Sequence, residues 1–120
     1  MTSENGRVDA GGNAFVSLRF ARGEMIDCLI DTGFNGDLFL PLDLAETLEL
    51  RITGEQEFQV AGGAILPAFT SLIEIEWLGS VRIAEVVLSE GADQLVGTAL
   101  LQGTRLMIDY IDRRVKIEKP

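Results

Sequence analysis

The chain has 120 residues, of which 19 are acidic and 10 basic, so its formal net charge is −9, and it contains no histidine. This length suits a single domain, and the lack of histidine excludes Ser-His and Cys-His nucleophile pairs as well as imidazole ligands for a metal. Carboxylates are therefore the acid–base groups that any catalysis would use first.

The remaining composition limits the partners. The single cysteine, Cys28, excludes an intrachain disulfide and a multi-cysteine metal site, and we expect it to be a small residue of the core. The negative charge and the scattered basic residues argue against nucleic acid, because phosphate binding usually needs a clustered basic face. No apolar run approaches the roughly 20 residues that cross a bilayer, so we expect no membrane partner.

The N-terminal segment differs from the rest of the chain. Residues 1–12 are polar and rich in glycine, which predicts a flexible tail and not a signal peptide. We therefore expect a cytoplasmic location. Residues 13–120 contain no linker, low-complexity run or tandem repeat, and we expect them to form one domain.

Several short strands are predicted along this domain. Apolar and polar residues alternate over residues 16–20, 73–77 and 115–117, and turn signals lie at 21–24, 61–63, 78–80 and 110–113. Short helices are predicted within 41–50, which starts with Pro41, and within 96–103, which ends in Gly103. The expected fold class is all-β, a barrel or sandwich with one or two short helices.

The residues with the strongest chemical signal lie in the segment 25–41, which is predicted to contain an apolar strand. The strand ends in the consecutive apolar residues Leu29 and Ile30, which predict burial on both of its faces. Asp31-Thr32-Gly33 follows directly after it. A carboxylate at such a place costs desolvation unless hydrogen bonds or a function compensate for it. An Asx-type turn between two strands is the simpler alternative.

Leu29-Ile30-Asp31-Thr32-Gly33 resembles the apolar-apolar-Asp-Thr-Gly signature of aspartic proteases. The short chain and the single copy of the motif make it similar to the retropepsin-like (clan AA) branch, and within that branch to its small bacterial and archaeal members. Residues 58–68 resemble the flap hairpin of that family, and Leu95-Val96-Gly97 resembles the motif before its C-terminal helix. Residues 106–109 and 115–117 resemble its closing strand pair.

The resemblance implies a retropepsin-like acid-protease barrel with one lobe per chain, acting as an aspartic endopeptidase on peptide or protein substrates. Asp31 from each subunit of a homodimer would activate a water molecule, with no cofactor and no metal. The implied roles of the other site residues are loop support for Thr32 and Gly33, flap contact with substrate for Ala61, Gly62 and Gly63, and structural support near the site for Val96 and Gly97.

Two departures from the family pattern bear on this hypothesis. Viral members carry an arginine after the glycine that corresponds to Gly97, whereas this chain has Thr98, so the strength of the dimer is in question. Phe34 stands where small residues are common in viral members, and we expect it in the core more than in the substrate groove. A non-catalytic dimeric β module that binds extended peptides is the alternative function, and an acidic β-barrel with an accidental Asp-Thr-Gly is a third.

Overall fold

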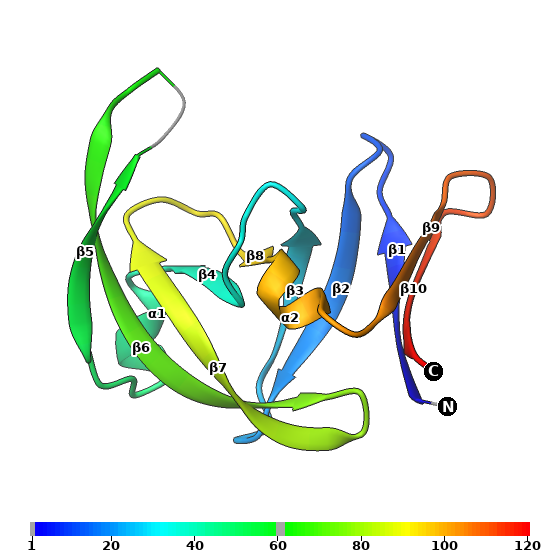
Figure 1. The fold of residues 1–120 in the computed structure, drawn as a ribbon, viewed down its shortest axis with the longest axis horizontal. Coiled ribbons are helices and arrows are strands. Elements are labelled where there is room, and N and C mark those ends of the chain that lie inside the picture. The colour runs from blue at the N-terminus through cyan, green and yellow to red at the C-terminus, as the bar shows by residue number, and fades with distance from the viewer. Residues whose placement is uncertain (1, 60–61) are drawn as a thin grey trace.

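The computed structural model describes residues 2–59 and 62–120, in which ten strands and two four-residue helices occur (Figure 1). The strands are β1 (Thr2–Val8), β2 (Ala14–Phe20), β3 (Met25–Ile30), β4 (Leu38–Pro41), β5 (Gly54–Gln59), β6 (Ile65–Trp77), β7 (Ser80–Ser89), β8 (Leu95–Val96), β9 (Arg105–Asp109) and β10 (Arg114–Lys119), and the helices are α1 (Leu44–Thr47) and α2 (Thr98–Leu101). The expected all-β class with one or two short helices is confirmed. No helix in the described ranges has the length and apolar character needed to span a membrane.

All ten strands belong to one sheet with the order β5-β6-β7-β4-β8-β3-β2-β1-β10-β9. The long strand β6 also pairs with β2, through Arg19 opposite Glu76 and Phe20 opposite Ile75, so the sheet curls back on itself. Most neighbours are antiparallel, but β3 pairs with β8 and β4 pairs with β7 in parallel. The β3–β8 pair places the carboxyl ends of these two strands side by side.

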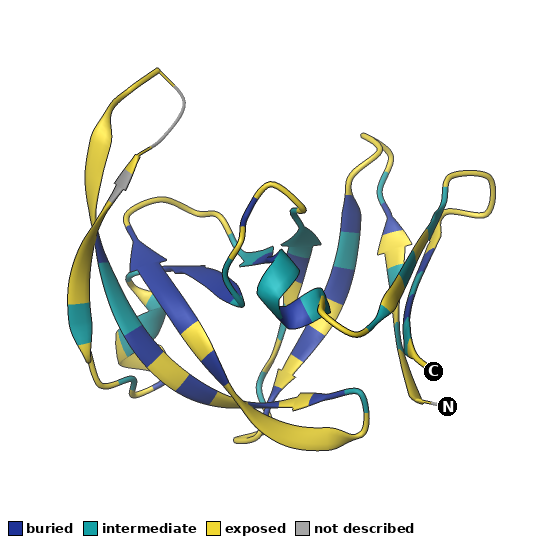
Figure 2. Ribbon diagram, in the orientation of Figure 1, coloured by how far each residue is buried: buried dark blue, intermediate teal, exposed yellow. Residues whose placement is uncertain are grey.

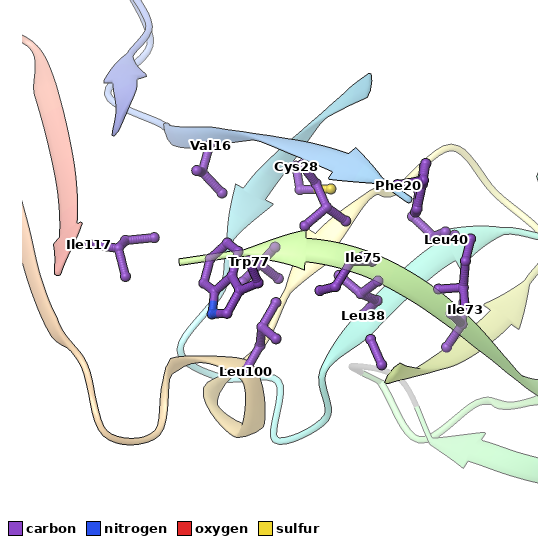
Figure 3. Close-up of a cluster of buried hydrophobic side chains, with 14 of the residues drawn as sticks. Val16, Phe20, Cys28, Leu38, Leu40, Ile73, Ile75, Trp77, Leu100 and Ile117 are labelled. Atoms are coloured by element: carbon purple, nitrogen blue, oxygen red, sulfur yellow. The ribbon is translucent and has the colours of Figure 1, made fainter. Parts of the chain in front are cut away.

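The main core lies inside this curl (Figures 2 and 3). The alternating residues of β2 and β6 face inward as their period of two predicts, and Leu100 of α2 joins them. The labelled members of the cluster in Figure 3 are Val16, Phe20, Cys28, Leu38, Leu40, Ile73, Ile75, Trp77, Leu100 and Ile117. Cys28 is fully buried there, and this burial raises the pKa of its thiol to about 12.

The expected burial of Leu29 and Ile30 on both faces of β3 is wrong, because both residues are only half-buried. Leu29 lies on a shallow depression that Phe15 and Leu95 also line. The outer face of β3 is therefore partly open just before Asp31.

The flexible tail expected over residues 1–12 is wrong for Thr2–Val8, which form β1. This strand pairs with β10 through six residue pairs and with β2 through three, so the two ends of the chain lie side by side (Figure 1). Strand pairing uses main-chain hydrogen bonds and does not require apolar side chains. A Cβ at Gly6 would meet the carbonyl oxygen of Phe15, so the glycine that suggested flexibility instead permits close strand contact.

Candidate active site

Asp31 lies directly after β3, where the parallel pair β3–β8 brings it beside Val96. The Asp31 main-chain N–H donates to the Val96 carbonyl at 3.0 Å, and the Asp31 carbonyl accepts from the Phe34 N–H at 3.1 Å. Its side-chain Oδ1 accepts from the Gly33 N–H at 2.9 Å, while no described residue donates to Oδ2. The Asx-type turn is therefore present, and it leaves one oxygen of a half-buried carboxylate free to act on something else.

The loop between β3 and β4 is fastened to the first turn of α2. Three consecutive main-chain N–H groups at the start of α2 donate to loop carbonyls: Gly97 to Asp37, Thr98 to Phe34 and Ala99 to Gly36, at 3.0, 2.8 and 3.2 Å. The Thr98 hydroxyl also contacts the Phe34 carbonyl at 3.3 Å. The loop thus satisfies donors that a helix N-terminus leaves without internal partners, and the helix in return holds the loop.

Gly97 is required by how closely these two segments approach. It is buried, and a Cβ at this position would collide with the Gly36 carbonyl and with the ring of Phe34. Val96, immediately before it, is fully buried in the main core. Both residues therefore lie beneath the Asp31 loop and not on the surface of the cleft.

The far end of the loop is tied to β7 by Asp37. Its Oδ2 accepts from the Glu85 main-chain N–H at 3.0 Å, and its Oδ1 lies 3.9 Å from the guanidinium of Arg82. The Asp37 side chain is only 15% exposed. The segment that carries Asp31 is consequently held at both ends.

A cleft of about 800 Å³ opens beside Asp31. Its apolar part includes Phe34 and Phe39, whose rings meet edge to face with centroids 6.0 Å apart, and these two belong to a small core of their own with Ala68 and Val87. Phe34 is 9% exposed, so it is a core residue as expected and also lines the groove. The described lining residues are Asp31, Gly33, Phe34, Asn35, Gly36, Phe39, Gln59, Leu66, Ser89, Glu90, Asp93 and Leu95.

The hairpin of β5 and β6 forms the opposite wall of this cleft. Gln59 and Leu66, which lie near the hairpin turn, line the cleft, and Gln59 pairs with Ile65 across the hairpin. Gly62 and Gly63 follow in the turn with φ of 90° and 84°, a left-handed conformation that favours glycine. Neither glycine lines the cleft, and the third residue expected at the tip, Ala61, lies outside the described residues.

The structure thus brings Asp31 and Gly33 into one cleft, with the Thr32 side chain exposed beside them and without a hydrogen bond to a described residue. The sequence analysis did not name Glu90 and Asp93, which lie in the loop between β7 and β8 a few residues before Val96-Gly97, and that proximity in sequence was the available signal. Leu95 was named only as part of the motif before α2. Gln59 and Leu66 fall within the expected flap hairpin, but hairpin alternation alone does not say which face meets a cleft.

The comparisons with known proteins define the fold. The chain is similar to a retropepsin-like aspartic protease from Rickettsia conorii, with a TM-score of 0.70 and 16% identity over 96% of this chain and 89% of that one. It is also similar to EIAV protease solved with an inhibitor, with a TM-score of 0.66 and 16% identity over 78% of this chain and 89% of that one. The fold is therefore that of the retropepsin-like aspartic proteases.

The sequence comparisons define the family. The chain is 30% identical over 115 residues to an uncharacterized protein of Archaeoglobus fulgidus, covering 88% of this chain and 86% of that protein. The chain belongs to the same family as this archaeal protein. No protein-family model matches the chain.

Proposed function

We propose that the protein is an aspartic endopeptidase that hydrolyses peptide bonds as a homodimer, with one Asp31 from each subunit. The observation that carries the proposal is the Oδ2 of Asp31, which accepts no hydrogen bond from a described residue and is held at the edge of a cleft in a retropepsin-like fold. The expected cytoplasmic location stays part of this proposal.

Two carboxylates are needed for this chemistry, and the Asp-Thr-Gly motif occurs once in the chain. When two Asp31 side chains meet across a two-fold axis, they share one proton, because two close negative charges resist ionising together. The ionised carboxylate takes a proton from the bound water, and the protonated one donates to the carbonyl oxygen of the scissile bond. The turn that fixes Oδ1 on the Gly33 N–H leaves Oδ2 for this work.

Features outside the cleft support association with a second copy. The Thr32 hydroxyl is exposed beside Asp31, where it can hydrogen-bond to a partner loop. The sheet ends at β9, and the turn after it exposes Tyr110 and Ile111, at 65% and 92%. In Figure 1 this turn, the Asp31 loop and the start of β6 lie along the same edge of the molecule. We propose that this edge faces the partner subunit.

Cleavage of an unstructured protein such as casein tests the activity. Between about pH 4 and 7, where carboxylates titrate, the wild type should release fragments and Asp31→Asn should release none. Asp43→Asn is the matched control, because Asp43 is exposed, makes no helix-cap hydrogen bond and lies outside the cleft, and it should retain full activity. Equal inactivity of wild type and Asp31→Asn under dimeric conditions would favour the non-catalytic peptide-binding module.

Sedimentation equilibrium tests the dimer. The wild type should sediment as a dimer, and Ile111→Lys should weaken association at least about tenfold, because it places a charge in an apolar contact. An active protein that remains monomeric at assay concentration would overturn the two-subunit site.

A further inference from the structure

We propose that the Asp31 cleft selects peptides that carry a lysine or arginine side chain next to the cleaved bond, and that Glu90 and Asp93 recognise its positive charge. This inference rests on the proposed function, since it names the substrate class of the same site. Neither residue has a role in the catalytic scheme above.

Glu90 and Asp93 reach the cleft from the loop between β7 and β8. Both are exposed, both line the cleft together with Asp31, and neither forms a hydrogen bond or an ion pair with a described residue. By contrast, Asp37 and Asp27 are each paired with an arginine. The carboxylates of the cleft are therefore available to a ligand.

No lysine or arginine stands among the residues described as lining the cleft. The other polar groups there are neutral, from Asn35, Gln59 and Ser89, and the chain as a whole carries a net charge of −9. Field lines in a low-dielectric cleft add to one another, so an incoming cation is attracted and an incoming carboxylate is repelled.

The residues that line the cleft also suit the long basic side chains. Phe34, Phe39, Leu66 and Leu95 offer apolar contacts, and Glu90 and Asp93 line the same cavity. Lysine and arginine place an apolar stem against such a surface and extend a charged head beyond it. A purely apolar side chain would use the apolar contacts only, and a short polar side chain would use neither the apolar contacts nor the acidic residues.

Cleavage mapping gives the first test. Fragments of casein produced by the wild type should show lysine or arginine enriched within two residues of the cleaved bonds, as read by mass spectrometry. Two peptides built around one mapped site, with lysine or its uncharged analogue norleucine at the flanking position, should then differ in kcat/KM by about tenfold or more. The preference should shrink as salt is raised from about 0.05 to 0.5 M.

Variants then test the two carboxylates. In Glu90→Gln/Asp93→Asn the lysine-to-norleucine ratio should fall to within about twofold, through a loss for the lysine peptide with little change for the norleucine peptide. Glu74→Gln is the matched control, because Glu74 is exposed on β6 outside the cleft and has no ion pair among the described residues, and it should keep the wild-type ratio. A wild-type ratio near one, or an unchanged ratio in the double variant, would overturn the inference while leaving the protease itself intact.

A binding measurement separates this inference from the proposed function. Fluorescein-labelled extended peptides of leucine and serine, with two lysines in one and two norleucines in the other, are titrated with Asp31→Asn and followed by anisotropy. Suppose that the wild type shows no cleavage, that the lysine peptide binds more tightly than the norleucine peptide, and that Glu90→Gln/Asp93→Asn abolishes this difference. The recognition of basic side chains is then supported, and the proposed protease activity is not. If neither peptide is preferred, the recognition fails whatever the casein assay shows.

Discussion

The two walls of the Asp31 cleft are built in opposite ways. The wall that carries Asp31 is held by main-chain hydrogen bonds to α2, by Asp37 on β7 and by two buried phenylalanine rings. The hairpin wall, β5 with the start of β6, exposes nearly every described residue near its turn. Substitutions on the first wall should therefore change the stability of the fold, whereas substitutions on the second should change mainly the binding of a peptide.

The largest difference between the two walls is expected from removing one apolar side chain from each. Phe39→Ala should lower the free energy of unfolding by about 4 kcal/mol, because it empties a buried site against Phe34. Leu66→Ala, where the side chain is 38% exposed, should cost less than about 1 kcal/mol but lower kcat/KM for a cleaved peptide. Urea denaturation measures the first quantity, and equal stability losses would break the comparison.

A smaller loss is expected where the loop meets α2. Gly97→Ala should cost about 3 kcal/mol, because the added methyl group collides with Gly36 and Phe34 and forces the loop away from the helix. Gly11→Ala is the control, since its Cβ would lie 3.3 Å from the flexible Asn13 amide, and it should change stability by less than about 0.5 kcal/mol. A Gly97→Ala protein with wild-type stability would show that Gly36 and Phe34 can move to accommodate the methyl group at little cost.

The tie between the loop and β7 is the next in size. Asp37→Ala should cost about 1.5 kcal/mol, because the Glu85 N–H loses a charged acceptor. Asp37→Asn keeps a side-chain acceptor and should recover part of this loss, which separates the hydrogen bond from the charge pairing with Arg82. Thermal denaturation of the two variants beside Asp43→Ala measures the difference in stability. Identical midpoints for all three variants would show that the contacts of Asp37 do not stabilise the fold.

At neutral pH the smallest effect concerns Cys28, which lies on β3 beneath the Asp31 wall. Burial raises the pKa of its thiol from 9.0 to about 12, so the folded protein holds this proton more tightly than the unfolded chain. The resulting stability is complete below pH 9 and is lost as the pH rises from 9 toward 12, a slope that Cys28→Ala should remove. At pH 8, Cys28 should resist alkylation in the native state, whereas a cysteine placed by Leu66→Cys on the hairpin wall should react readily. Comparable rates for the two thiols would contradict the packing difference between the walls.

Local patterns predicted β2, the second half of β6, β10 and both helices, because side-chain periodicity and turn residues act over a few residues; β7 was not predicted. Residues 16–20 and 73–77 alternate in burial as they alternate in polarity. The failure at β1 has an equally clear cause. Its stability comes from pairing with β10, more than 100 residues away in the chain, and main-chain pairing leaves almost no trace in side-chain composition.

The order of the amino acids was enough to predict the all-β class, the lack of histidine chemistry and Asp31 as the candidate site residue. Those properties follow from residue type and short-range order. The folded chain was needed to show which oxygen of Asp31 has no described donor, why residue 97 is glycine and which residues share the cleft. These depend on segments that approach from β3, α2, β5 and the loop before β8, and such contacts are created by long-range packing and not by the residues on either side.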